Sequence, residues 1–91
     1  MQTKTQPFDI AVHLQTDADI REFLQEAAEG TAAEFIYALN IAARAKGITK
    51  LAHQAGVTRA SLYKSLSAEG NPRFDTISKI ITALGCRLAI A

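Results

Sequence analysis

Helix start and stop signals recur along this chain and constrain its fold more than any other feature. Thr16 and Asp19 have the spacing of a capping box, in which two side chains bond the free N–H groups at a helix N-terminus, and Thr31 and Glu34 repeat that spacing. Apolar residues follow each box at helical intervals, and a glycine closes each apolar stripe. The two amphipathic helices expected from these signals span residues 16–30 and 31–46.

The remaining pattern is also mostly helical, with short alternating segments at both ends. Apolar and polar residues alternate with a period of two over 8–14 and 86–90, which indicates short strands. Glycine and Asn-Pro mark a loop near residues 67–72. The further helices expected are 49–55, 59–66, and one from 73 or 74 to 84. The expected fold class is therefore all-α, a bundle of about five helices with short N- and C-terminal strands.

At 91 residues the chain has the length of one small domain. Its longest apolar run, residues 35–39, is too short to cross a membrane, and its N-terminus has no apolar signal core. From these two observations we expect a cytoplasmic protein with no membrane segment.

The net charge of +1 conceals two segments of opposite sign. Residues 1–35 carry two basic and seven acidic side chains, a net −5, whereas residues 36–91 carry eight basic and two acidic side chains, a net +6. Such asymmetry indicates two different partners, one of which could be a polyanion. Because charged side chains occupy the solvated faces of most proteins, the charge alone does not decide the matter.

The known catalytic and metal-binding patterns are absent from the sequence. Cys86 is the single cysteine, so neither a disulfide nor a paired-cysteine metal site can form within the chain. His13 and His53 lie far apart and do not have metal-ligand spacing. No phosphate-binding glycine loop or nucleophile elbow occurs. We expect a protein that is not an enzyme, with no catalytic residue, cofactor or metal.

Residues 48–67 have the spacing of a helix-turn-helix. Ala52 is small at the position where the second short helix would cross the first. Gly56 supplies the positive φ that a tight turn between helices requires. Val57, Leu62 and Leu66 are spaced to face inward and to hold the second helix against the core. The opposite face of that helix is then left for a partner.

This outer face has no acidic side chain and begins at Thr58, an expected N-cap. Arg, Ser and Thr can bond base edges in the DNA major groove, and the start of the preceding helix would reach phosphates. The expected DNA-binding residues are Thr49, Lys50, Thr58, Arg59, Ala60, Ser61, Tyr63 and Lys64. Arg44, Lys46 and Ser67 are candidates for further phosphate contacts. Two short helices joined by glycine also occur in bundles that bind no DNA, and Tyr63 could instead cover the end of the core.

Several residue runs are characteristic of one family. They are Ala38-Leu39, residues 42–49, Ser61 to Leu66, Gly70-Asn71-Pro72 with Phe74 and Thr76, and Ala83-Leu84-Gly85. Through these runs the segment 38–85 resembles the lambda-repressor-like (XRE) helix-turn-helix class, and more closely the HigA-type addiction-module antidote proteins. Phe8-Asp9 and the acidic stretch 17–29 extend the resemblance to roughly residues 8–90. Arg73 departs from it, because many relatives have a helix-capping Ser there.

The resemblance implies a lambda-repressor-like fold and the antitoxin of a type II toxin-antitoxin module. Such a protein neutralises a RelE- or ParE-like toxin and, as a homodimer on operator DNA, represses its own operon. A small basic toxin would complement the acidic segment electrostatically. The candidate toxin-binding residues are Asp17, Asp19, Glu22, Glu26 and Glu29. The acidic helix could equally serve only to cover the core.

Two other functions stay open at this point. One is a stand-alone phage-type repressor without a toxin partner, and the other is a protein-interaction module whose helix-turn-helix is vestigial. In each case residues 1–91 form a single domain. Its expected parts are an acidic N-terminal extension with a strand and a helix (1–30), a helix-turn-helix DNA-binding core (31–85) and a C-terminal strand (86–91).

Overall fold

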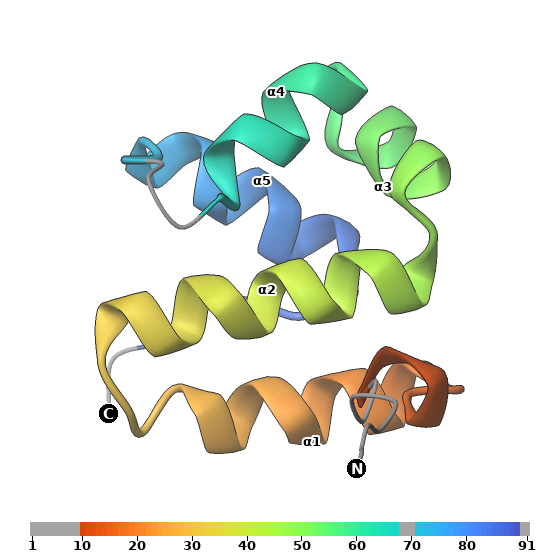
Figure 1. Ribbon diagram of the computed structural model, residues 1–91, viewed down its shortest axis with the longest axis vertical. Helices are drawn as coiled ribbons and strands as arrows, with labels where there is room; N and C mark the ends of the chain where they lie inside the picture. The colour runs from red at the N-terminus through yellow and green to blue at the C-terminus, as the bar shows by residue number, and fades with distance from the viewer. Residues whose placement is uncertain (1–9, 68–70, 90–91) are drawn as a thin grey trace, which may run out of the picture.

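A computed structural model describes residues 10–67 and 71–89, and this part of the chain is helical throughout its regular structure (Figure 1). The elements are η1 (Ile10–His13, a 3₁₀ turn), α1 (Asp17–Ala27), α2 (Ala32–Lys46), α3 (Ile48–Ala55), α4 (Arg59–Ser65) and α5 (Phe74–Ala83). Helix α2 lies between α1 on one side and the group α3 to α5 on the other (Figure 1). The expected all-α class is confirmed.

Both capping boxes form as the sequence predicts. The Thr16 hydroxyl accepts from the Asp19 N–H at 3.0 Å, and the Asp19 carboxylate accepts from the Thr16 N–H at 3.2 Å. The Thr31 hydroxyl accepts from the Glu34 N–H at 3.1 Å, and the Glu34 carboxylate accepts from the Thr31 N–H at 2.7 Å. Each box satisfies backbone donors that the first turn of a helix would otherwise leave unpaired, and so sets where α1 and α2 begin.

One hydrophobic core joins residues from all five α-helices. Its largest fully buried side chains are Leu39, Leu51, Leu62, Ile80 and Leu84. Three buried alanines on α2, Ala38, Ala42 and Ala43, belong to the same core and have side chains small enough to let neighbouring helices approach closely. Ile20 and Leu24 of α1 are buried in it too. The acidic helix is therefore a structural part of the bundle.

The turn between α3 and α4 is a compact backbone motif. Gly56 has φ 73°, and the N–H groups of Gly56 and Val57 donate back to the carbonyls of His53 and Ala52 at 3.2 and 3.0 Å. This pair of bonds is a Schellman motif, which a left-handed glycine permits. Two residues later the Thr58 hydroxyl accepts from the Ser61 N–H at 3.0 Å and caps α4. The Thr58 cap and the positive φ of Gly56 are confirmed.

Helix α4 is held to the core from its inner side. Leu62 and Leu66 are buried as expected, whereas Val57 is half-buried. The side-chain amide of Asn40 on α2 donates to the Leu66 carbonyl at 3.4 Å, just beyond the C-terminal end of α4. Apolar packing and this hydrogen bond together fix α4 against α2.

The two expected terminal strands are wrong in the part of the chain that the structure describes. Residues 10–13 form the 3₁₀ turn η1, and residues 86–89 have no strand pairing; residues 8, 9 and 90 lie outside the described residues, as do 68–70 of the expected loop. A strand needs a partner for its backbone N–H and C=O groups, and an alternating pattern does not reveal whether one exists. In η1 the Leu14 N–H donates locally, to the Ala11 carbonyl at 3.3 Å.

The last helix begins at Phe74, and its N-cap residue, Arg73, makes no side-chain capping bond. Arg73 instead approaches Asp75, with 3.5 Å between its Nε and the carboxylate. Phe74 shares the spacing of the inner stripe of α5 but is 75% exposed. No described helix is both long and apolar enough to span a bilayer.

Candidate binding surfaces

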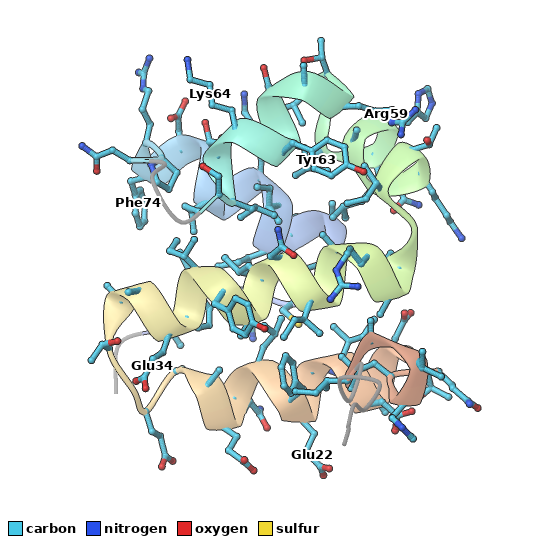
Figure 2. The ribbon with its side chains drawn as sticks, in the orientation of Figure 1. Glu22, Glu34, Arg59, Tyr63, Lys64 and Phe74 are labelled. Carbon is cyan, nitrogen blue, oxygen red and sulfur yellow. The ribbon has the colours of Figure 1, made fainter. Side chains whose placement is uncertain are left out.

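The outer face of α4 is open to solvent along its whole length. The residues expected to bind DNA are all exposed: Thr49 and Lys50 on α3, and Thr58, Arg59, Ala60, Ser61, Tyr63 and Lys64 on or before α4. Figure 2 shows Arg59 and Lys64 projecting from opposite ends of α4, with Tyr63 between them. Tyr63 is 48% exposed, so its ring is available on the surface and does not close the core.

This surface carries basic and neutral groups only. Residues 48–65, which make up α3, the turn and α4, contain no aspartate or glutamate. The Thr58 hydroxyl is engaged in the α4 cap, so its place in the surface is structural. Arg59, Ser61 and Lys64 keep their side chains pointing outward on a helix whose inner side is fixed by the core. The surface can therefore present a rigid row of donors to an anionic partner.

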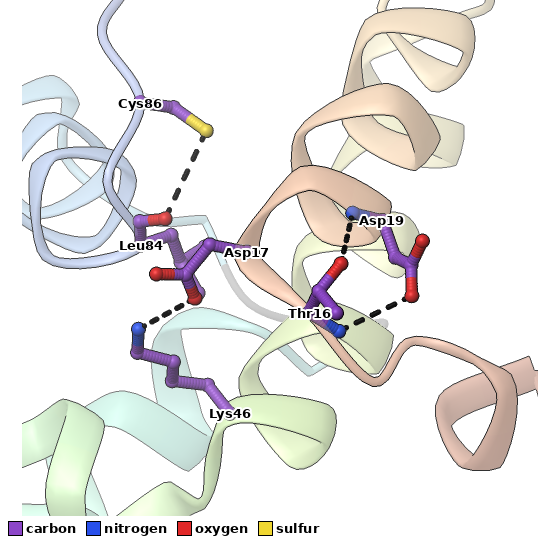
Figure 3. A network of polar contacts seen from close by, with 6 residues as sticks. All are labelled: Thr16, Asp17, Asp19, Lys46, Leu84 and Cys86. Atoms are coloured by element: carbon purple, nitrogen blue, oxygen red, sulfur yellow. Dashed lines mark hydrogen bonds and ion pairs between the residues drawn. The ribbon is translucent and has the colours of Figure 1, made fainter.

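The three residues expected to contact phosphates sit in different environments. Arg44 is exposed, and the Ser67 hydroxyl donates to the Lys64 carbonyl at 3.0 Å. The Lys46 side chain is only 16% exposed, and its ammonium nitrogen lies 2.9 Å from the Asp17 carboxylate (Figure 3). This ion pair joins the end of α2 to the first turn of α1. Lys46 is thus turned toward α1.

The ion pair with Lys46 lowers the pKa of the Asp17 carboxyl. A hydrogen bond from Lys46, and then the positive charge of that ammonium, hold the pKa of Asp17 below its ordinary value of 3.8. The Asp17 side chain is itself 62% exposed, so solvent screens much of this interaction. The pair orients α1 on the bundle more than it stabilises the fold.

The outer face of α1 is acidic. Of the five carboxylates expected to contact a toxin, Asp17 is paired with Lys46 and Asp19 is bonded to the backbone of its own cap. Glu22 and Glu26 are exposed one turn apart on α1, and Glu29 is exposed in the turn just after the helix. Figure 2 shows Glu22 pointing away from the bundle, on the side opposite Lys64. These three glutamates form the acidic face of α1.

Sequence reasoning missed an apolar hollow between α2 and the start of α5. Tyr37 and Phe74 both line it and are exposed, although Phe74 has the helical spacing of the inner stripe of α5. The hollow has a volume of about 720 Å³. Helical spacing shows that Phe74 lies on the inner face of α5, but it does not show whether another helix covers that face in the first turn. The exposure of Phe74 therefore becomes visible only in the assembled bundle.

No cluster that could hold a metal exists among the described residues. Cys86 is half-buried, and its thiol lies 3.9 Å from the Leu84 carbonyl (Figure 3). Such a half-buried free cysteine behaves as a small hydrophobic residue with a weak S–H donor.

Comparison with known proteins gives the chain a family. Residues 4–91 match the family described as "Probable addiction module antidote protein". An uncharacterized protein of Haemophilus influenzae is 36% identical over 91 residues, covering 99% of this chain and 94% of its own length. No solved structure matches the sequence. Since the family match spans almost the whole chain, this protein belongs to the family of probable addiction module antidote proteins, a family that implies an antitoxin role and a toxin partner.

Proposed function

We propose that this protein is the antitoxin of a type II toxin-antitoxin module and that it also represses its own operon by binding operator DNA through a lambda-repressor-like helix-turn-helix. The proposal of DNA binding is carried by the exposed outer face of α4, which bears Arg59, Ser61 and Lys64. Neither α3 nor α4 contains an aspartate or a glutamate. Membership in the antidote family supports the toxin-binding half. The expected toxin is a small basic RelE- or ParE-like protein.

Helix α4 has suitable dimensions for the major groove. Its seven residues are about 10 Å long, and the groove is about 12 Å wide and admits one α-helix. Arg59 and Ser61, near the start of α4, would bond base edges, while Lys64 and Tyr63 would bond the phosphate backbone beside them. Thr49 and Lys50, at the exposed start of α3, would bind phosphates on the adjacent strand. The Thr58 cap keeps the first turn of α4 in place for these contacts.

One such unit makes a small DNA interface, so we infer that the protein acts as a homodimer on two half-sites. Half-sites read by paired helix-turn-helix units are about 34 Å apart, one turn of the DNA helix. Two bound copies also add their phosphate contacts, which steepens the salt dependence of binding.

Toxin capture is assigned to the acidic face of α1, Glu22, Glu26 and Glu29. These exposed carboxylates would attract a basic toxin and raise its association rate. Helix α2 separates α1 from α3 and α4 (Figure 1), so a toxin on α1 leaves the outer face of α4 clear. One molecule could hold toxin and operator at the same time.

Operator binding by single-alanine variants tests the DNA-binding half. We expect Arg59→Ala and Lys64→Ala each to weaken binding to the DNA upstream of the gene by about 5- to 150-fold if the lost contact is to a base. If the lost contact is to phosphate, the slope of log affinity against log salt should fall by about 0.9 for each contact. Arg21→Ala on α1 is the matched control, since it removes the same charge from an exposed helix on the other side of α2.

The same experiment separates a second candidate function. The family description names an antidote, which supports toxin binding, and the second candidate is a toxin-binding module whose α3 and α4 do not bind DNA. In that case Arg59→Ala and Lys64→Ala would match wild type and Arg21→Ala in every DNA titration. Such a result would defeat the repressor assignment and leave the antitoxin role in place.

A further inference from the structure

The apolar hollow between α2 and α5 has a volume of about 720 Å³. Among its described lining residues are Ala33, Ile36 and Tyr37 of α2, and Pro72, Phe74 and Ile77 at the start of α5. None of the described residues that line it is charged. Tyr37 and Phe74, two of the large aromatic side chains that line it, are both exposed, and an exposed apolar lining of this kind marks interaction sites. The hollow therefore has the character of an interface.

We propose that this hollow is where a second copy of the chain docks, so that the dimer is isologous and is built around Phe74 and Tyr37. The inference rests on the proposed function, in which two copies bind two half-sites. It adds the surface through which the two copies meet.

The charge of each face points to this occupant. In an isologous contact the same patch meets itself, so a patch of single-sign charge would repel its own copy. The acidic face of α1 and the basic face of α4 are both unsuitable for that reason, whereas the described lining residues of the hollow are neutral. Arg73 and Asp75, on either side of Phe74 in the sequence, are exposed and supply one charge of each sign. In a two-fold contact built around Phe74, Arg73 of each copy can pair with Asp75 of the other.

The place of the hollow in the fold also suits a dimer on DNA. It includes Leu66 and Ser67, directly after α4, and Figure 2 shows Phe74 on the side of the molecule where the Lys64 end of α4 lies. A two-fold contact there would bring the C-terminal ends of the two α4 helices toward each other. Half-sites one turn of DNA apart are separated by about 34 Å, so the two α4 helices of a DNA-bound dimer must lie near each other.

The inference is tested by the monomer–dimer equilibrium of Phe74→Asp and Tyr37→Asp in sedimentation experiments without DNA. Phe74 is the first residue of α5, where an acidic side chain is favourable, so the variant should fold. Val12→Asp is the matched control, since Val12 is 63% exposed and lies on η1, away from the hollow. We expect the dimer dissociation constant to rise about a hundredfold in the two variants and to stay within twofold of wild type in the control.

Three results would overturn the inference. The first is a wild-type protein that is monomeric at 100 μM, roughly a hundred times a micromolar dissociation constant. The second is that the variants dimerise as well as wild type, and the third is that the variants lose toxin binding while the wild type is monomeric. The last would make the toxin the occupant of the hollow. The proposed function fails separately, because the sedimentation experiment contains no DNA. A dimeric wild type and a monomeric Phe74→Asp would support the inference even if neither protein bound operator.

Discussion

The outer faces of α1 and α4 are both exposed and both charged, yet they use their charge differently. On α4, Arg59 and Lys64 project freely from a helix that is fixed by its inner side and by the Thr58 cap. On α1, the first two carboxylates bond within the protein: Asp17 pairs with Lys46, and Asp19 accepts a hydrogen bond in the helix cap. The net charge of a segment therefore overstates what it can offer to a partner.

The two helices also share one core. Ile20 and Leu24 of α1 are buried in the same cluster as Leu51 of α3 and Leu62 of α4. Deleting residues 1–30 would therefore uncover the core, and any loss of toxin binding could follow from unfolding. Side-chain substitutions on the two outer faces separate the functions without that complication.

The largest expected effect comes from matched core truncations, Leu62→Ala on α4 and Leu24→Ala on α1. Both leucines are buried in one core, so each truncation should lower the free energy of unfolding by about 2–5 kcal/mol. Urea unfolding followed by circular dichroism checks this. Each variant should unfold in a single transition. A Leu24→Ala protein that loses α1 first and the remaining helices later would show that α1 is a separate unit.

Gly56→Ala should cost about 1–2 kcal/mol in unfolding free energy, because an alanine must adopt φ 73° there. Nothing lies within 4 Å of the added methyl group, so the cost is one of backbone conformation. Gly85→Ala is the matched control, with φ 84° and equally open space. Both should lose similar stability, but Gly56→Ala alone should weaken operator binding, because it tilts α4. Equal operator affinities in the two variants would contradict a fixed α3–α4 geometry.

Removing an N-cap hydroxyl should lower the free energy of unfolding by about 1 kcal/mol, which allows a finer comparison of α1 with α4. Thr58→Ala and Thr16→Ala each delete one cap acceptor, on α4 and α1 respectively. Thermal unfolding should show similar losses for both. Operator affinity should fall only for Thr58→Ala, since that cap positions the first turn of α4. If operator affinity fell only for Thr16→Ala, the assignment of DNA binding to α4 would be wrong.

The smallest effect concerns the ion pair between Asp17 and Lys46. Because the pKa of Asp17 is lowered, the pair stabilises the fold above pH 3.8 and the stabilisation disappears as pH falls below that value. Asp17→Asn should therefore be slightly less stable than wild type at pH 7, and the difference should shrink as pH is lowered to about 2.5. Denaturant midpoints at both pH values measure this. A difference that grows toward low pH would contradict the direction of the pKa shift.

The helices could be predicted from sequence because their signals are local. The capping pairs at Thr16 and Thr31 and the glycine after α3 satisfy backbone groups within four or five residues, and the structure has them where expected. The expected strands failed because a strand depends on a partner elsewhere in the chain. Alternation over residues 10–14 accompanies a 3₁₀ turn instead.

Contacts between residues far apart in the sequence could not be predicted either, because they too depend on partners elsewhere in the chain. Lys46 and Asp17 are 29 positions apart, and Asn40 and Leu66 are 26 apart. No spacing rule connects them, because the packing of α1 and α4 on α2 brings them together. The exposure of Tyr37 and Phe74 is likewise a result of assembly. The exposure of the residues on α4 was easier to predict, since a helix has one inner and one outer face.

Toxin and operator affinities of the triple variant Glu22→Gln, Glu26→Gln, Glu29→Gln test the central claim most directly. The claim is that the acidic face of α1 binds toxin and the basic face of α4 binds DNA, on opposite sides of α2. We predict that neutralising the three glutamates weakens toxin binding at least tenfold, mainly through a slower association rate, and leaves operator affinity within about twofold of wild type. Unchanged toxin affinity, or an equal loss for both partners, would contradict the claim.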